Sequence, residues 1–290
     1  MRPVVVAAGG TGGHFFPAEA LAAELAGRGQ RVVLMTDARS GGLKSPAFEG
    51  RERFVLAGSG IAGRGALSAV RALGALAAGT VQARAILSRL RPAAIVGFGG
   101  YPSVAPVLAS RFIRPRPAVV LHEQNGVLGR ANRWLAGRAD VLALSLAATT
   151  RLPEGVPTEV TGNPVRPAIT ALAASPYVAP DAKIHLLVLG GSLGARVFSD
   201  IVPPALALLT REMRARLLVT QQCRAEDLER VRAAYAAAGI RATLSPFFAD
   251  VAALLHDAHL VVARAGASTV AELAVVGRPA VLVPLPGAID

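Results

Sequence analysis

A run of glycines ending in a histidine directly follows the first apolar segment of the sequence. Val4–Ala7 is followed by Gly-Gly-Thr-Gly-Gly-His at residues 9–14, with Pro17 soon after. Glycine lets backbone N–H groups approach an anion closely, and the N-terminus of a following helix adds partial positive charge. Proline suits the first turn of such a helix. The pattern predicts a phosphate-binding turn, although a tight strand-to-helix turn without a ligand would look the same.

Three further glycine-rich turns repeat this arrangement, at 97–101, 190–196 and 264–269. Glu272 lies about one turn into the helix expected after the last of them. A carboxylate there can accept hydrogen bonds from two vicinal hydroxyls, as ribose presents. The alternative is an acid that only stabilises the helix N-terminus. Together the four turns predict a phosphate-bearing donor and leave room for a phosphate-bearing acceptor.

A nicotinamide-binding site is the nearest alternative for the first turn. Gly10 and Gly12 fit the first two glycines of that motif, and Asp37 ends the second apolar run, where a ribose-binding acid would stand. Phe15 occupies the position of the third glycine, which argues against this alternative. A Walker A site is excluded because no Gly-Lys-Ser/Thr sequence occurs, and no Asp-x-Asp pair is present to hold a divalent ion. We expect no cofactor and no metal.

The elements that must position these residues follow from the pattern of apolar runs. Short apolar runs without alternation suit strands that are buried on both faces of a parallel sheet. Ala- and Leu-rich stretches between them suit helices, and the β-α-β order predicts an α/β fold with doubly wound parallel sheets. The expected helices are Ala18–Arg28, Ala66–Leu90 (as one helix or two), Glu226–Ala238 and Val251–His256. The expected strands are Val4–Ala7, Val32–Met35, Phe54–Leu56, Ala94–Phe98, Val119–Leu121, Val141–Leu144, Leu186–Leu189, Leu217–Thr220, Ala242–Leu244, Leu260–Ala263 and Ala280–Val283.

The regular order breaks at the Pro- and Gly-rich segment 161–167. We place a domain boundary here, which gives an N-terminal domain of residues 1–162 and a C-terminal domain of residues 163–290. Two parallel α/β domains that face each other leave a cleft at the carboxyl edges of their sheets. Ligands of such folds bind at these edges.

The positive charge of the chain is concentrated in its first half. The net charge is +12, from 31 Lys and Arg against 19 Asp and Glu. Between Arg64 and Arg138 eleven arginines stand against one acid, Glu123, which favours an anionic partner. Aromatic residues are only 4% of the chain, so stacking platforms for nucleic acid are scarce and an anionic bilayer fits better. Ala66–Leu90 is then either a core-facing helix or an apolar patch at a membrane surface, and codon bias is the alternative source of the arginines.

Other features of the sequence indicate the cellular compartment in which the protein is expected. Hydrophobic residues make up 52% of the chain, which excludes disorder. The lone Cys223 excludes an internal disulfide and a cysteine-cluster metal site, which fits a reducing cytosol. The first residues do not form a signal peptide, and no apolar stretch approaches a membrane span of roughly 20 residues. We expect a soluble protein, or one attached to a membrane only by its surface.

Six segments taken together resemble the MurG family of GT-B glycosyltransferases, glycosyltransferase family 28. The resemblance runs along the whole chain. Its members move N-acetylglucosamine (GlcNAc) from UDP-GlcNAc onto undecaprenyl-diphosphate-MurNAc-pentapeptide (lipid I), which gives lipid II of peptidoglycan. The six segments are Gly9–His14, Gly97–Tyr101, His122–Asn125, Gly162–Arg166, Gly190–Arg196 and Arg264–Glu272.

The resemblance implies a role for each matching residue. His14 would assist the acceptor hydroxyl as the catalytic residue. Phe248 would read the uracil edge through its backbone, and Glu272 would bind the ribose hydroxyls. The acceptor diphosphate would contact Gly13, His14, Gly99, Gly100 and Tyr101. The UDP-GlcNAc donor would contact Thr11, Gly12, Gly13, Asn125, Arg166, Ser192, Phe248, Ala267, Ser268, Thr269 and Glu272.

The resemblance also implies a reaction and a setting. Transfer would invert the anomeric configuration in a single displacement, with neither metal nor cofactor. The partners would be UDP-GlcNAc, lipid I, the anionic inner-membrane surface and other cell-wall synthesis proteins, and not nucleic acid. The enzyme would lie peripherally on the cytoplasmic face of the bacterial inner membrane and serve cell-wall biogenesis, cell shape and cell division.

Two departures from the family pattern keep alternatives open. Relatives commonly carry His-Gln-x-Gly where this chain has Thr220–Cys223, and they continue beyond Asp290 with a Gln pair and further helices. One alternative is therefore a truncated, inactive UDP-sugar-binding fragment. Another is a UDP-GlcNAc 2-epimerase-like isomerase, which would need extra acids in the cleft, where the sequence offers mainly Glu123.

Overall fold

The chain forms two compact units, Met1–Arg166 and Pro167–Ile289. The computed structural model describes residues 1–10, 12–38, 40, 45–57, 66–191 and 194–286, and the side chains of 66–69 are outside this description. The boundary between the units lies at the end of the Pro- and Gly-rich segment 161–167, four residues beyond Gly162.

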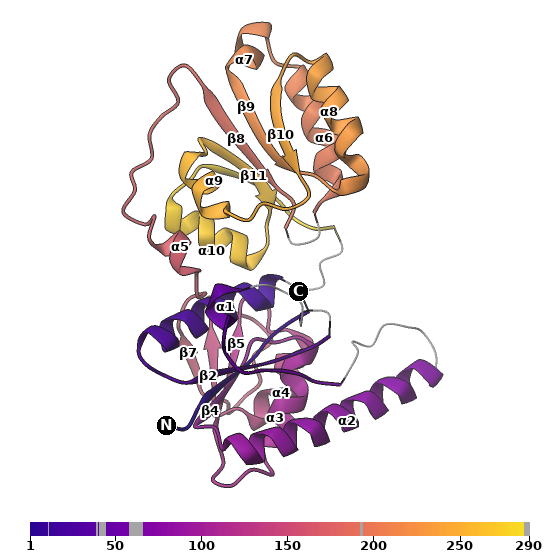
Figure 1. Cartoon of the computed structure of the whole chain (residues 1–290), viewed down its shortest axis with the longest axis vertical. Helices are drawn as coiled ribbons and strands as arrows, with labels where there is room; N and C mark the ends of the chain where they lie inside the picture. The colour runs from indigo at the N-terminus through magenta and orange to yellow at the C-terminus, as the bar shows by residue number, and fades with distance from the viewer. Residues whose placement is uncertain (11, 39, 41–44, 58–65, 192–193, 287–290) are drawn as a thin grey trace. The chain divides into compact units, whose positions relative to one another are not determined.

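The first unit is built on a seven-stranded parallel sheet in the order β3-β2-β1-β4-β5-β6-β7 (Figure 1). Its strands are β1 Val4–Ala7, β2 Val32–Thr36, β3 Arg53–Val55, β4 Ala94–Gly97, β5 Ala118–Glu123, β6 Val141–Leu144 and β7 Thr158–Val160. Its α-helices are α1 Gly12–Gly27, α2 Ala66–Leu90, α3 Val104–Ser110 and α4 Arg130–Leu135. Short 3-10 helices are Pro46–Phe48, Tyr101–Ser103 and Ala136–Arg138.

Successive strand residues of this sheet enter two different hydrophobic cores. Because side chains alternate across a strand, Val5 faces one side of the sheet and Val6 the other. Val5 packs with Leu87 of α2 and Val107 of α3, whereas Val6 packs with Phe15 of α1. Helices therefore cover both faces, as expected for a doubly wound sheet.

The second unit contains a five-stranded parallel sheet in the order β10-β9-β8-β11-β12 (Figure 1). Phe198 of α6 and Tyr235 of α8 pack with Val188 and Val219 of the sheet in one core. Its strands are β8 Ile184–Leu189, β9 Leu217–Gln222, β10 Arg241–Ser245, β11 Leu260–Arg264 and β12 Ala280–Val283. Its α-helices are α5 Pro167–Thr170, α6 Arg196–Ala207, α7 Arg211–Arg216, α8 Leu228–Ala237, α9 Val251–Asp257 and α10 Ala267–Val276, and a 3-10 helix is Ala225–Asp227.

Each apolar run expected to be a strand falls within a strand, to within one or two residues at either end. The first helix begins six residues before Ala18, so that His14 lies in its first turn. The expectation missed β7, because its sequence Thr-Glu-Val is exposed and has no apolar run. Residues 66–90 form one continuous helix, and Gly79 is needed within it because a Cβ there would lie 2.3 Å from the carbonyl oxygen of Ala57.

The helix α2 has both buried and exposed apolar residues. Leu87 is fully buried against the sheet, whereas Leu73 and Val81 are each 68% exposed. No helix in the described ranges combines the length and the apolar character needed to cross a bilayer.

Candidate active site

The glycine turns of the first unit meet because their strands are parallel and in register. Ala7, the last residue of β1, pairs with Gly97, the last residue of β4, and Gly97 pairs with Leu121 of β5. The segments that follow these strands therefore leave the same edge of the sheet. The hydroxyl of Ser103 joins two of them, at 3.0 Å from the carbonyl oxygen of Ala7 and 2.9 Å from that of Gly99.

The imidazole of His14 packs on the backbone of the second glycine turn. A Cβ on Gly100 would lie 3.1 Å from Cδ2 of His14 and 3.4 Å from its Nε2. A Cβ on Gly99 would lie 3.5 Å from Cε1. Both glycines have a left-handed backbone, with φ of +80° at Gly99 and +65° at Gly100, so a side chain is disfavoured here by conformation as well as by space.

The imidazole is also hydrogen-bonded to the polar run at the end of β5. Nδ1 of His14 lies 2.9 Å from Oε1 of Gln124. Nε2 of Gln124 lies 2.9 Å from Nδ1 of His122, and Nε2 of His122 lies 3.0 Å from the carbonyl oxygen of Gly162. Burial lowers the pKa of His122, although the Gly162 carbonyl and the Glu123 carboxylate oppose this effect. His122 is therefore a neutral hydrogen-bonding group near neutral pH.

Glu123 does not present a free acid to a substrate. Its side chain is only 2% exposed. Its carboxylate accepts hydrogen bonds from the backbone N–H groups of Asn125 and Gly129 and from the side-chain amides of Asn125 and Asn132, at 2.9–3.1 Å. The carboxylate on which the epimerase alternative mainly depends therefore holds the loop after β5 together.

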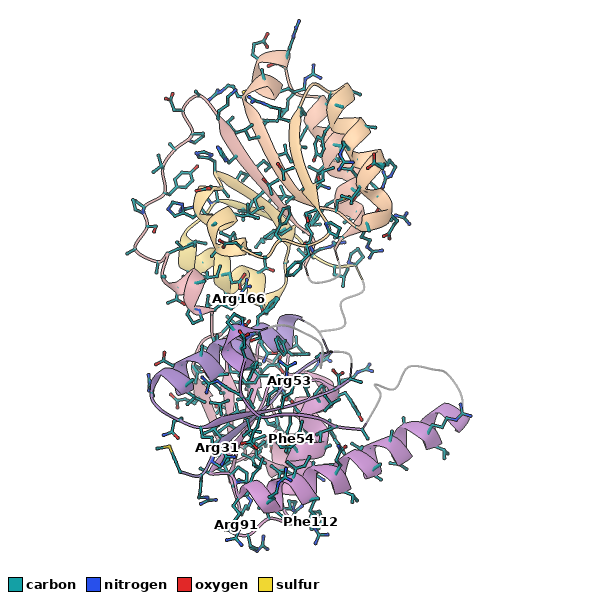
Figure 2. The ribbon with its side chains drawn as sticks, in the orientation of Figure 1. Arg31, Arg53, Phe54, Arg91, Phe112 and Arg166 are labelled. Atoms are coloured by element: carbon teal, nitrogen blue, oxygen red, sulfur yellow. The ribbon has the colours of Figure 1, made fainter. Side chains whose placement is uncertain are left out.

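Other predicted residues of the first unit lie beside the same elements. The guanidinium of Arg166, which is labelled in Figure 2, stacks over the ring of Phe16 in α1. The distance between Cζ and the ring centroid is 4.6 Å. The hydroxyl of Tyr101 lies 3.3 Å from the carbonyl oxygen of Ala57. Burial and, to a lesser extent, the charge of Asp37 raise the pKa of Tyr101, which therefore stays a hydrogen-bonding phenol at neutral pH.

The first glycine turn is fixed partly by its own neighbours. The N–H group of Gly10 donates to Oγ of Ser40 at 2.6 Å, so this amide is already engaged. A Cβ on Gly9 would lie 2.7 Å from Oγ1 of Thr36. Gly12 is buried and Gly13 is exposed at the start of α1. Thr11, which we also predicted in the donor site, lies outside the described residues.

The predicted donor residues of the second unit gather at the carboxyl edge of its own sheet. Ala267, Ser268 and Thr269 form the first turn of α10, directly after β11, and Gly266 is its N-cap. Glu272 lies in the second turn and is 9% exposed. The half-buried Phe248 lies in the loop between β10 and α9. Ser192 lies outside the described residues.

Gln222 connects two of these loops and was not identified from the sequence as a site residue. Its Oε1 accepts from the N–H group of Gly190 at 3.1 Å, and its Nε2 donates to the carbonyl oxygen of Pro246 at 3.2 Å. A Cβ on Gly190 would lie 2.2 Å from the backbone nitrogen of Ala195, so the turn after β8 requires glycine. The sequence carried no signal for it, because Gln222 stands at the variable position of the His-Gln-x-Gly pattern and the retained glutamine is Gln221.

Two parallel-sheet units with glycine-rich turns at their carboxyl edges define an α/β protein of the GT-B fold class. The glycosyltransferase family 28 N-terminal domain matches residues 4–143, and the C-terminal domain of the same family matches residues 185–290. The chain belongs to glycosyltransferase family 28.

Similar proteins of known name agree with this family. A UDP-N-acetylglucosamine–N-acetylmuramyl-(pentapeptide) pyrophosphoryl-undecaprenol N-acetylglucosamine transferase of Granulibacter bethesdensis is 65% identical over 100% of this chain and 76% of its own length. A transferase of the same name from Acidiphilium cryptum is 59% identical over 98% of this chain and 77% of its own length. The crystal structure of MurG from Acinetobacter baumannii is 31% identical, with a TM-score of 0.71, over 100% of this chain and 80% of that one.

The fold is shared more widely than the family. A UDP-GlcNAc 2-epimerase from Neisseria meningitidis, solved with UDP-GlcNAc bound, has a TM-score of 0.64 over 97% of this chain and 82% of its own. Its sequence is 10% identical, so the likeness concerns the fold alone.

Proposed function

We propose that this chain transfers GlcNAc from UDP-GlcNAc to undecaprenyl-diphosphate-MurNAc-pentapeptide, which yields lipid II. The observation that carries the proposal is the 65% identity, over the whole chain, to a transferase named for this donor and acceptor. The described parts of the six sequence segments lie at the carboxyl edges of the two sheets or in the chain just before the unit boundary.

The second unit supplies the proposed donor site. The first turn of α10 presents backbone N–H groups and the hydroxyls of Ser268 and Thr269 at a helix N-terminus, which suits a diphosphate. We assign Glu272 to the ribose hydroxyls and the backbone of Phe248 to the uracil. From the first unit we assign Thr11, Gly12, Gly13, Asn125 and Arg166 to the donor, and Ser192 joins them from the second unit.

The first unit supplies the proposed acceptor site and the proton acceptor. His14 packs on Gly100, so a diphosphate held by Gly13, Gly99, Gly100 and Tyr101 would lie beside the imidazole. In the proposed reaction the acceptor hydroxyl attacks the anomeric carbon with inversion while the bond to the UDP phosphate breaks. His14 takes the hydroxyl proton. The charge that develops on UDP is stabilised by the helix N-terminus of α10.

A peripheral position on the cytoplasmic face of an anionic inner membrane is the proposed setting. Phe112 and Trp134 of the first unit are 61% and 51% exposed. Arg84 stacks on Phe112 and Arg138 stacks on Trp134, at 5.5 and 5.4 Å from the ring centroids. Exposed aromatic rings beside arginines suit the interface of an anionic bilayer. Other cell-wall synthesis proteins stay predicted partners.

The proposal is tested by identifying the products formed from UDP-GlcNAc in the presence and absence of lipid I. We expect lipid II and UDP when both substrates are present, and no UDP-N-acetylmannosamine when lipid I is withheld. The epimerase alternative predicts the opposite pair of results. The described acids also argue against it, because Glu123 is fully engaged by N–H donors.

A further inference from the structure

A series of hydrogen bonds leads from the backbone of Gly162 to the imidazole of His14. The linked atoms are the Gly162 carbonyl oxygen, Nε2 and Nδ1 of His122, the carboxamide of Gln124 and Nδ1 of His14, with each contact at 2.9–3.0 Å. His122 and Gln124 are 4% and 3% exposed. All four residues belong to the first unit.

The direction of donation along this series is fixed at its backbone end. A carbonyl oxygen can only accept, so Nε2 of His122 carries the proton that bonds to Gly162. A neutral imidazole has one N–H group, so Nδ1 of His122 is then an acceptor. Burial lowers the pKa of His122 and keeps the ring neutral. Nδ1 of His122 therefore receives a hydrogen bond from the NH₂ group of Gln124.

A second acceptor fixes the orientation of the Gln124 carboxamide. Nε2 of Gln124 also donates to the carbonyl oxygen of His122 at 3.0 Å. Rotating the carboxamide by half a turn would place its oxygen against two acceptors and leave its NH₂ group facing His14. The side-chain oxygen therefore points at Nδ1 of His14, and it can only accept.

We propose that Gln124 and His122 are positioning residues for His14. Together they hold the proton of His14 on Nδ1 and leave its Nε2 unprotonated, so that Nε2 can accept a proton. Nε2 is on the side of the ring that packs on Gly100. The tautomer follows from the hydrogen bonds alone, whereas its use in proton transfer rests on the proposed function. The arrangement places a neutral glutamine where many catalytic histidines have a carboxylate.

The tautomer is measured by nitrogen-15 NMR of histidine-labelled protein, which has only five histidines. His259 provides an internal reference, because its Nδ1 accepts from the backbone N–H group of His185 at 2.9 Å and its pKa is lowered, chiefly by burial. We expect His259 and His122 to carry their protons on Nε2 and His14 to carry its proton on Nδ1. A His14 proton on Nε2 in the unaltered protein would overturn the proposal, whatever the activity.

Variants of Gln124 separate positioning from packing. Gln124→Met keeps the side-chain length, but its thioether sulfur is only a weak acceptor for His14. We therefore expect a mixture of His14 tautomers and a kcat lowered about tenfold or more, which is less than the roughly 10²–10⁴-fold loss expected when proton transfer is removed altogether. Gln124→Glu still accepts from Nδ1 and should retain the tautomer and more of the kcat. The Kd for UDP should change by less than about twofold in both variants, which shows that the protein is folded.

Two outcomes of these variants would count against the positioning role. If His14 keeps its proton on Nδ1 in Gln124→Met, Gln124 does not set the tautomer. If Gln124→Glu loses the tautomer as Gln124→Met does, an oxygen that accepts from Nδ1 of His14 is not what sets the tautomer. A correct tautomer pattern in a protein that makes no lipid II would instead refute the proposed function and leave the positioning role intact.

Discussion

The imidazole of His14 lies so close to Gly100 that a methyl group on this glycine would be 3.1 Å from Cδ2 of the ring. The two residues are 86 positions apart, and they meet because β1 and β4 are neighbours whose carboxyl ends are aligned. The backbone of the second glycine turn therefore packs against one side of the His14 imidazole, the proposed proton acceptor.

Replacing Gly100 by alanine should therefore displace His14. The variant should lose kcat for GlcNAc transfer by about tenfold or more, because proton transfer depends on the position of the imidazole. Gly155→Ala is the matched control, since Gly155 has a similar φ of +73° and no atom within 4 Å of its added Cβ. Both variants should lose about 1–3 kcal/mol of folding stability, because φ is positive at both positions and ψ is −179° at Gly100, a combination that essentially only glycine adopts. Equal kcat values in the two variants would show that the His14 contact has no role.

Glu272→Gln should weaken binding of UDP donors by about 1.5–3 kcal/mol, because charge-assisted hydrogen bonds to the ribose are lost. The comparison uses calorimetric titration with UDP and with 2′,3′-dideoxy-UDP, which has no vicinal hydroxyls. Only the binding of UDP should depend on the substitution. If both nucleotides lose affinity alike, Glu272 supports α10 and does not bind ribose.

Binding to lipid vesicles should rise with the fraction of anionic lipid and fall with salt, because exposed charges are screened over about 8–10 Å. Arg84→Gln together with Arg138→Gln should weaken this binding by about 1 kcal/mol for each arginine at the surface. Arg28→Gln together with Arg51→Gln is the control, since these arginines are exposed in the same unit outside the segment 64–138. Cosedimentation that is independent of salt would favour apolar docking in place of charge.

His122 should make the first unit sensitive to acid. Its pKa is lowered in the folded state by burial, so below its ordinary value of about 6.5 the unfolded chain binds the proton more readily. The contribution of His122 to the free energy of unfolding is then fully present above that pH, and it decreases as the pH falls below it. Trp134 is the only tryptophan and belongs to the first unit, so its fluorescence reports unfolding there. Between pH 7.5 and pH 5.5 the free energy of unfolding should fall less in His122→Phe than in the unaltered protein. An equal fall would show that His122 does not cause the acid sensitivity.

The sequence identified the turns better than it identified the contacts between them. A continuous apolar run followed by glycines marks the end of a buried strand, and this local signal placed Gly9–His14 and Gly97–Tyr101 correctly after β1 and β4. The strand β7 was not predicted, because this exposed edge strand has no continuous apolar run. The extent of α1 was underestimated, because glycines at 12 and 13 lower helix propensity but do not prevent a first turn.

The partners of the polar side chains could not be read from the sequence. Glu123 and Gln124 are adjacent in the chain, yet one holds the loop after β5 and the other holds His14. Which of the two side chains faces α1 depends on the strand order β1-β4-β5, and that order requires the folded sheet. Gln222 was not identified for the same reason: its two partners follow the ends of β8 and β10, and only the folded sheet brings them near it.

The role of His14 in transfer is tested most directly by the single-turnover rate of GlcNAc transfer from UDP-GlcNAc to lipid I, compared between the unaltered chain and His14→Ala. The Kd for UDP is measured on the same preparations. We expect transfer by the unaltered chain, a rate lowered by roughly 10²–10⁴-fold in the variant and an unchanged Kd for UDP. Equal rates, or a loss of UDP affinity as large as the loss of rate, would contradict this role.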